Sequence, residues 1–406
     1  MVITVLKSRL LRVFASRTRF AMSLGAVVAV AAIGVPAAAG ASATAVGAQP
    51  GGVTVSRAAP FPATMVGLHC WTASNCIAVG ANFPQMATQL IAERWNGSHW
   101  TRSAMPKPAG ADEVTIGSVA CPTRTECVAV GAGYPPPTSK AASPFPLVDY
   151  WNGSRWTAGR AVTVGSGDLL EAVSCSSARN CYAVGNYTSK GGAEFLPLTE
   201  HWNGSGWSRQ AAPVPSGTTF GELNAVSCPT AKFCVAAGTD GNGELIERLT
   251  ASGWSKTTPK SAPSAMLFGV SCPSASSCVA VGSALTTFGG SVGQRWNGRT
   301  WSAFSTPVPR GASNAGLQSV SCVSANHCLA VGDYTTSKVY ADTWNGSGWH
   351  LAAMTTTGGH LGALGAVDCV AAASCVVLAG TTQFVATTRS ESAFWNGTRW
   401  KVVLTA

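Results

Sequence analysis

The stretch LQSVSCVSANHCLAVGDYTTSKVYADTWNGSGWHLAAM, Leu317–Met354, decides the fold. It contains four short segments that alternate in polarity or are continuously apolar and β-rich, at 317–322, 328–332, 339–344 and 349–354. Turn residues such as Gly, Asn and Ser separate the segments, and no helical period runs through them. Four short antiparallel strands of this kind form one blade of a β-propeller.

The same pattern recurs along the chain. Fourteen cysteines form pairs with five intervening residues: Cys70/Cys76, Cys121/Cys127, Cys175/Cys181, Cys228/Cys234, Cys272/Cys278, Cys322/Cys328 and Cys369/Cys375. Each pair precedes a Trp-x4-Trp element: Trp95/Trp100, Trp151/Trp156, Trp202/Trp207, Leu249/Trp254 as a degenerate copy, Trp296/Trp301, Trp344/Trp349 and Trp395/Trp400. First cysteines lie 44 to 54 residues apart, and such a period indicates a propeller or solenoid.

We therefore predict an all-β, seven-bladed propeller with four antiparallel strands per blade. A β-helix is the alternative, although its coils are usually shorter. The expected division is a leader at 1–45, a segment at 46–65 that adds a ring-closing strand, and the propeller at 66–406. Its repeats are expected near 66–110, 111–165, 166–216, 217–261, 262–311, 312–358 and 359–406.

An even number of regularly paired cysteines in an exported chain predicts disulfides, one within each repeat. Each would staple the inner hairpin at its turn, with one cysteine at the end of a strand and the other at the start of the next. Zinc ligation usually has tighter spacing with additional His or Cys nearby, and thiol redox catalysis favours a single C-x-x-C site. No cofactor and no metal site are predicted.

The Trp-bracketed turn is interpreted as a second staple. Asn345-Gly346 favours positive φ in a tight hairpin, and a tryptophan on each arm lets two large rings pack beside the turn. The alternative is functional: the tryptophans would form an exposed row on which sugar rings stack.

The first 45 residues have the order of a secretory leader. Five basic residues and no acid precede an apolar run, and small-residue cleavage sites follow at 41–45. An uncleaved membrane anchor is the alternative, because the apolar run is nearly long enough to span a bilayer. The whole chain carries a net charge of +10, but the mature part keeps 22 basic against 17 acidic residues without a basic cluster. Nucleic acid is therefore not an expected partner, and the mature protein is expected to be extracellular and monomeric.

The frame L-x-x-V-x-C, A-V-G, W-N-G-x-x-W and a final Pro resembles the repeat of photosystem II stability/assembly-factor-like propellers. It resembles more loosely the Asp-box (BNR) repeats of the sialidase-like superfamily, in which S-x-D-x-G-x-T-W joins the third and fourth strands. Here Trp replaces the Asp, and only the Gly and the last Trp persist. The resemblance covers 66–406 and implies a fold, closest to that of secreted bacterial propellers with one disulfide per blade, and not an activity.

Spacing within the repeats indicates where function could lie. The Cys and Trp spacings are constant, whereas the segment from the glycine after the second Cys to the first Trp position varies from 11 to 20 residues. Variable loops on a rigid scaffold are common binding sites. The candidate binding residues there are Tyr134, Tyr187, Lys190, Asp240, Glu244, Asp333, Tyr334 and Lys338. Asp240 to Glu244 resembles a cation loop without its full spacing, and all eight are also compatible with solvated loop residues.

No catalytic constellation stands out in the sequence. The recurring acids Glu93, Asp149, Glu200, Glu247 and Asp342 precede the first Trp position by two residues and are interpreted as structural. No sialidase arginine triad and no nucleophile elbow are found. We therefore expect a non-catalytic binding or scaffold propeller that engages a cell-envelope glycan or a protein. The alternative is a carbohydrate-active enzyme, a glycosidase or lyase, with two or more acids in the central channel.

Overall fold

The computed structural model describes residues 63–82, 89–136, 138, 143–163, 165–189, 192–214, 217–257, 264–285, 290–334, 338–352, 354, 364–379 and 391–404. The chain divides into two units, and one of them, Ile3–Ala58, lies outside these ranges. The predicted leader and the segment 46–62 also lie outside them. Within the described residues, no helix is long and apolar enough to cross a membrane.

Seven four-stranded antiparallel sheets make up the described structure, each built from four consecutive strands. Blades 1 to 3 consist of β1 (Ala63–Thr72), β2 (Asn75–Asn82), β3 (Gln89–Trp95), β4 (Trp100–Ala104); β5 (Glu113–Thr123), β6 (Glu126–Tyr134), β7 (Phe145–Trp151), β8 (Trp156–Ala158); and β9 (Ser166–Ser177), β10 (Asn180–Thr188), β11 (Phe195–Trp202), β12 (Trp207–Gln210). Blades 4 and 5 consist of β13 (Glu222–Thr230), β14 (Phe233–Thr239), β15 (Glu244–Thr250), β16 (Gly253–Lys256); and β17 (Ala265–Ser274), β18 (Ser277–Ala284), β19 (Ser291–Trp296), β20 (Trp301–Phe304). Blades 6 and 7 consist of β21 (Gly316–Ser324), β22 (His327–Tyr334), β23 (Lys338–Trp344), β24 (Trp349–Ala352); and β25 (Leu364–Ala371), β26 (Ser374–Ala379), β27 (Glu391–Trp395), β28 (Trp400–Leu404).

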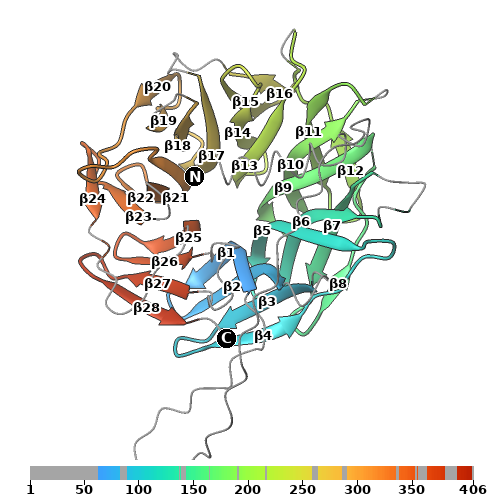
Figure 1. Cartoon of the computed structure of the whole chain (residues 1–406), viewed down its shortest axis with the longest axis horizontal. Coiled ribbons are helices and arrows are strands. Elements are labelled where there is room, and N and C mark those ends of the chain that lie inside the picture. Colours follow the sequence, from blue (N-terminus) through green and yellow to red (C-terminus); the bar gives the residue numbers. More distant parts are fainter. Residues whose placement is uncertain are drawn as a thin grey trace, which may run out of the picture. The chain divides into compact units, whose positions relative to one another are not determined.

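The blades form a closed ring, which confirms the predicted fold class. The first strand of every blade borders the centre, and β25 of the last blade contacts β1 of the first (Figure 1). Apolar clusters fill the spaces between neighbouring blades, so the core is distributed around the ring.

One end of every blade carries the same row of side chains. In blade 1 Cys70 pairs with Cys76, Cys76 with Trp95, and Trp95 with Trp100 across the four strands. All seven disulfides join the two cysteines of one blade, as predicted. The indole of Trp95 donates a hydrogen bond to the carbonyl of Ala73 in the disulfide turn at 3.1 Å, and blades 3, 5 and 6 repeat this bond. The inner and outer hairpins are thereby tied together.

The disulfides are more deeply buried than cross-links at a surface turn usually are. Both cysteines of a pair flank the turn of the inner hairpin, as the spacing predicts, and the second cysteine is in addition buried in the packing between blades. In the first five blades this residue is at most 2% exposed: Cys76, Cys127, Cys181, Cys234 and Cys278. Each of the five belongs to an apolar core cluster. These cysteines are therefore core residues as well as cross-links, and they cannot contact a ligand at the surface.

The Trp-bracketed turn differs from its prediction. Trp344 pairs with Trp349, so the reversal is a four-residue loop and not a two-residue Asn-Gly hairpin. Only Gly346 has a positive φ, of 95°. The Asn345 side-chain oxygen accepts the backbone N–H groups of Ser347 and Gly348 and so fixes the loop. In the six blades that have both tryptophans, the ring centroids lie 5.0 to 5.9 Å apart.

Hydrogen bonds between blades join the inner strands. The serine before the first cysteine accepts the backbone N–H of the first cysteine of the next blade at four junctions: Ser174 with Cys228, Ser227 with Cys272, Ser271 with Cys322 and Ser321 with Cys369. At the junction that closes the ring, Asp368 takes the place of serine and accepts Cys70 N–H at 2.7 Å. His69 lies 3.9 Å from the same carboxylate.

The first prediction concerns the disulfides. The Cys228→Ala/Cys234→Ala double variant should lose about 2 kcal/mol of unfolding free energy, because it opens a loop of about seven residues. Urea unfolding measures the loss. A peptide map of the unreduced wild-type protein is the control, and a link between different repeats would contradict the pairing.

The second prediction concerns ring closure. Asp368→Ala should destabilise the ring by roughly 1–3 kcal/mol, because it leaves the nearly buried Cys70 N–H without its acceptor. Asp368→Ser should retain most of the stability, because serine accepts the same bond at four other junctions. Equal loss in both variants, measured by urea unfolding, would argue against this hydrogen bond.

Candidate functional site

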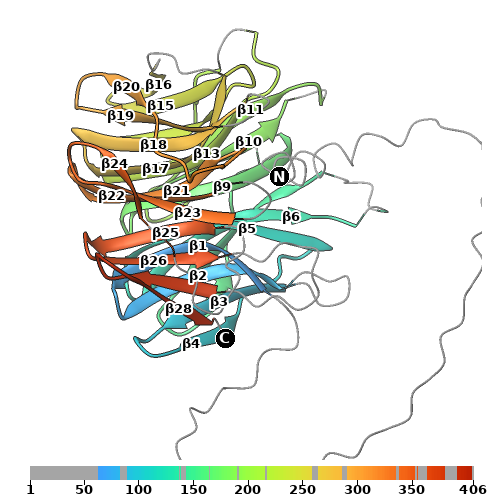
Figure 2. The same cartoon turned by 60° about the vertical axis from the view of Figure 1, so that its left-hand side comes forward.

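The two faces of the ring are built differently. The row of disulfides and tryptophans puts the first and third turns of each blade on one face, which we call the stitched face. The second turns and the connections between blades lie on the opposite face, which we call the loop face. Seen from the side, the strands run between these faces (Figure 2).

The strands around the centre carry one shared irregularity. The register of the inner hairpin skips the residue four positions before the first cysteine, so a bulge occurs there. The bulged residues are half-buried or exposed, and they are Val66, Gly117, Glu171, Asn224, Phe268, Gln318 and Gly365. Only one of the seven is a carboxylate. The acid pair required for glycoside hydrolysis is therefore not present at these positions.

The recurring acids lie on the third strands of five blades, away from the centre. Glu93, Asp149, Glu200, Glu247 and Asp342 are at most 1% exposed. Glu93 pairs with Arg102 at 2.7 Å, and Glu200 accepts the N–H of Val162. Each acid belongs to a different blade and is buried within it.

Burial changes the protonation of these acids. Desolvation raises the pKa of Asp149, Glu200 and Asp342 to about 7 and that of Glu247 to about 8. Neither Asp149 nor Glu247 has a hydrogen-bond partner for its side-chain oxygens among the described residues. A neutral carboxylic acid is less costly to bury than a carboxylate, which explains the upward shifts.

The two candidate binding residues on blade 4, Asp240 and Glu244, bond to other groups of the protein. Asp240 accepts the N–H groups of Asn242 and Gly243 and pairs with Lys256 at 3.2 Å. Glu244 accepts the Gln294 amide at 2.8 Å, and burial raises its pKa. The described residues contain no group of three His, Cys, Asp or Glu side chains that could hold a metal ion.

Asp333 is likewise buried and hydrogen-bonded within the protein. It is 2% exposed and lies 3.3 Å from the Gln318 amide, and burial raises its pKa. It therefore lies in the wall of its blade. Its neighbours Tyr334 and Lys338 are cross-strand partners at the tip of β22 and β23 on the loop face. Tyr334 is half-buried against Tyr340, and Lys338 is exposed.

The remaining candidates lie in other blades. Tyr187 is half-buried, with the Arg209 guanidinium 4.5 Å from its ring centroid. Tyr134 ends β6 and is half-buried. Lys190 lies outside the described residues. The structure therefore brings Asp333, Tyr334 and Lys338 together on the β22–β23 hairpin. It also places Asp240 and Glu244 on the β14–β15 hairpin and leaves the other two tyrosines in separate blades.

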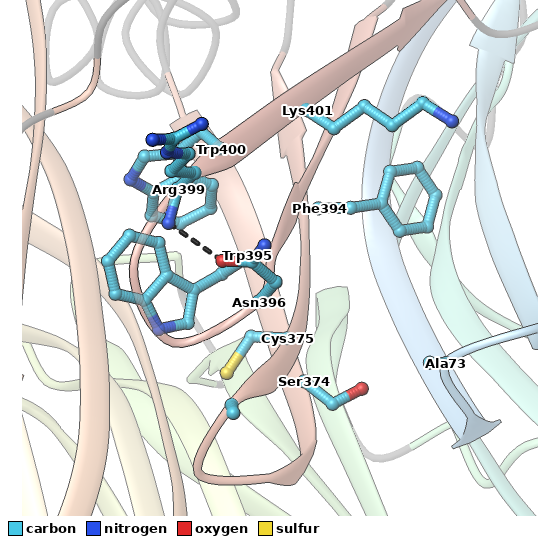
Figure 3. Close-up of a pocket in the computed structure, with 10 residues that line it drawn as sticks. Ala73, Ser374, Cys375, Phe394, Trp395, Asn396, Arg399, Trp400 and Lys401 are labelled. Atoms are coloured by element: carbon cyan, nitrogen blue, oxygen red, sulfur yellow. Dashed lines mark hydrogen bonds between the residues drawn. The ribbon is translucent and has the colours of Figure 1, made fainter.

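The stitched face, whose tryptophans the sequence predicts to be a structural staple or, alternatively, a row on which sugar rings stack, carries two cavities. One of about 330 Å³ lies between blades 6 and 7 and includes Thr343, Trp344 and Trp395 in its wall. The other, of about 480 Å³, lies between blades 7 and 1 and includes Trp395, Trp400 and Arg399 (Figure 3). All four tryptophans of blades 6 and 7 are half-buried, whereas most of those in the other blades are buried.

No protein-family model and no curated protein match this sequence. Among solved structures, the chain is similar to "YCF48 bound to D1 peptide", with a TM-score of 0.51, 10% identity and coverage of 79% of this chain and 92% of that one. YCF48 from Cyanidioschyzon merolae gives a TM-score of 0.52, 12% identity and coverage of 80% and 95%. A six-bladed lectin from Aleuria aurantia gives a TM-score of 0.46, 11% identity and coverage of 84% and 95%. At these identities the likeness to YCF48 shows the fold alone.

The buried third-strand acids predict that stability falls as the pH rises. In the unfolded chain these side chains ionise near pH 4, whereas in the folded chain they keep their protons until about pH 7 to 8. The folded state therefore binds more protons between these values, and each acid contributes stability that is complete below pH 4 and lost as the pH rises through its folded pKa. His69, whose pKa burial lowers to about 4, has the opposite effect but only below pH 6.5.

The melting temperature should accordingly fall from pH 6.5 to pH 8. Glu247→Gln should flatten this slope by up to about 1.4 kcal/mol per pH unit, since it removes one titrating group. Gln294 occupies the equivalent position in blade 5 and is fully buried, so glutamine fits this environment. Arg299→Ala, an exposed turn variant, is the control, and an unchanged slope in Glu247→Gln would contradict the assignment.

Proposed function

We propose that this protein is a secreted, non-catalytic binding or scaffold propeller that engages a cell-envelope glycan or a protein partner through its loop face. The observation that carries the proposal is the asymmetry of the ring. One face consists of constant turns with a disulfide in every blade, and the other consists of loops whose length varies from blade to blade. A rigid scaffold with variable loops is suited to recognition, because the scaffold fixes the ends of loops whose sequence and length can differ.

The distribution of acids supports a non-catalytic role. The seven bulged positions around the centre contain one carboxylate, Glu171, and the buried acids of the third strands lie in separate blades. Loop-face acids such as Asp333 and Glu244 are bound to amide groups of the fold. These observations favour binding over glycoside hydrolysis.

Two features support an extracellular location. Seven disulfides are typical of proteins that fold in an oxidising compartment. The leader-like order of the first 45 residues agrees with export. The resemblance to Asp-box repeats and a bacterial origin of this protein remain predictions from the sequence.

The complex of YCF48 with a peptide provides a precedent for a partner. Its title describes a bound peptide, and its fold is similar to that of this chain. A short segment of a protein partner is therefore as reasonable a ligand for the loop face as a glycan.

The test is binding of the oxidised mature chain, residues 46–406, to cell-wall fractions, a glycan array and envelope proteins, with released sugar assayed in the same wells. Tyr334→Ala/Lys338→Ala and Tyr187→Ala should each weaken binding of the partner about tenfold or more, because partly accessible tyrosines and neighbouring charged side chains often contribute most to binding energy. Arg299→Ala on the stitched face should bind as the wild type does.

Unchanged affinity in both loop-face variants would reject the loop face as the binding surface. Release of sugar in proportion to protein concentration would reject the non-catalytic role.

A further inference from the structure

The side chain before the first tryptophan of a blade covers the first tryptophan of the next blade. Five junctions show this contact, with the group 4.8 to 5.7 Å from the ring centroid: Arg94 on Trp151, Tyr150 on Trp202, Arg248 on Trp296, Arg295 on Trp344 and Phe394 on Trp95. The covering group is a guanidinium at three junctions and an aromatic ring at two. Covering each indole in this way is part of how neighbouring blades pack.

The two remaining junctions differ from one another. Between blades 3 and 4 the first tryptophan is replaced by Leu249, and His201 stacks instead on Tyr182 of its own blade at 4.5 Å. Between blades 6 and 7 the tryptophan, Trp395, is present, but the covering position holds Thr343. Threonine is too short to reach across to the indole. Among the described residues, no ring or cation of blade 6 stacks on Trp395.

The 330 Å³ cavity lies at this junction. Thr343 and Trp395 line it, together with the exposed side chains of His327 and Asn345. The uncovered indole therefore coincides with an open space between the two blades. Its volume is within the range of small-molecule sites.

The neighbouring 480 Å³ cavity shares Trp395 and extends the site across blade 7. Asn396 and Arg399 lie at the β27–β28 turn beside Trp395 and Trp400, and Lys401 projects on the side of blade 1 (Figure 3). Among the described residues, neither cavity has an aspartate or glutamate in its wall. Both cavities contain half-buried indoles and an amide group, and the positive charge comes from Arg399 and Lys401 of the 480 Å³ cavity, which adjoins the 330 Å³ cavity at Trp395.

We propose that this region of the stitched face is a second binding site, in which an acidic saccharide stacks one sugar ring on Trp395. The C–H groups of a pyranose ring carry partial positive charge and fit the negative face of an indole. Arg399 and Lys401 of the adjoining cavity attract the carboxylate of a uronic acid unit and repel a ligand with a guanidinium or ammonium group. The site is on the opposite face from the loops of the proposed function and does not depend on it.

The decisive variant is Thr343→Arg. It gives the junction the residue that covers tryptophan at three others, and Arg295 occupies the same register position in blade 5. The arginine should cover Trp395 and block the site while leaving the fold intact. Thr343→Ser, which leaves the indole uncovered, is the matched control.

The experiment titrates oligogalacturonate into the oxidised protein and follows tryptophan fluorescence and heat. Wild type and Thr343→Ser should bind alike, whereas Thr343→Arg and Trp395→Ala should bind at least tenfold more weakly. Neutral cello-oligosaccharides and cationic chitosan oligomers should bind at least tenfold more weakly to the wild type. Circular dichroism and melting temperature confirm that each variant is folded.

Undiminished binding by folded Thr343→Arg would overturn the site, and so would the absence of oligogalacturonate binding to the wild type at millimolar concentration. Equal binding of the neutral sugar, or preferential binding of the chitosan oligomer or an arginine-rich peptide, would overturn the ligand class. Tyr334→Ala/Lys338→Ala should retain oligogalacturonate binding, which separates this site from the loop face.

Discussion

The row of a disulfide and an indole pair at one end of each blade, with Leu249 in place of one indole in blade 4, is the interaction on which the rest of the structure depends. It fixes the register of all four strands at once, because two cysteines and two tryptophans are successive cross-strand partners. The indole-to-carbonyl bond in four blades then ties the disulfide turn to the outer hairpin. With one end of each blade constrained, the other end can differ in loop length without loss of register.

The fold could be predicted because its main constraints are local in sequence. The constant Cys and Trp spacings each lie within one hairpin, so the strand order, the disulfide pairing and the two-faced ring follow from a single repeat. The geometry of the turn was harder to predict. The Asn-Gly pair favours a two-residue hairpin, but the side chain of Asn345 accepts two backbone N–H groups and stabilises a longer loop with an ordinary φ at the asparagine.

Contacts between blades could not be predicted, because their partners are about one repeat apart and on different sheets. The position before the first tryptophan reads Arg, Tyr, His, Arg, Arg, Thr and Phe along the chain. Its role emerges only when Arg94 is seen over Trp151. The burial of a second cysteine such as Cys234 has the same origin, since the cluster that covers it includes residues of the preceding blade. The position of Asp333 in a variable segment predicts an accessible carboxyl group. In the structure the blade buries this carboxyl beside a glutamine amide, which a single strand pattern does not reveal.

A ring of near-identical blades makes its exceptions informative. Asp368 replaces the serine at the junction where the last blade meets the first. This exception therefore lies where the ring has to close. Replacing Trp with Leu249 removes an indole and, with it, the need for a cover. Thr343 has no such compensation, because Trp395 remains and a cavity lies beside it. An uncovered indole with a cavity beside it lacks packing contacts that the covered indoles have. A ligand that supplies the missing contact would recover that energy on binding, so this junction is suited to recognition.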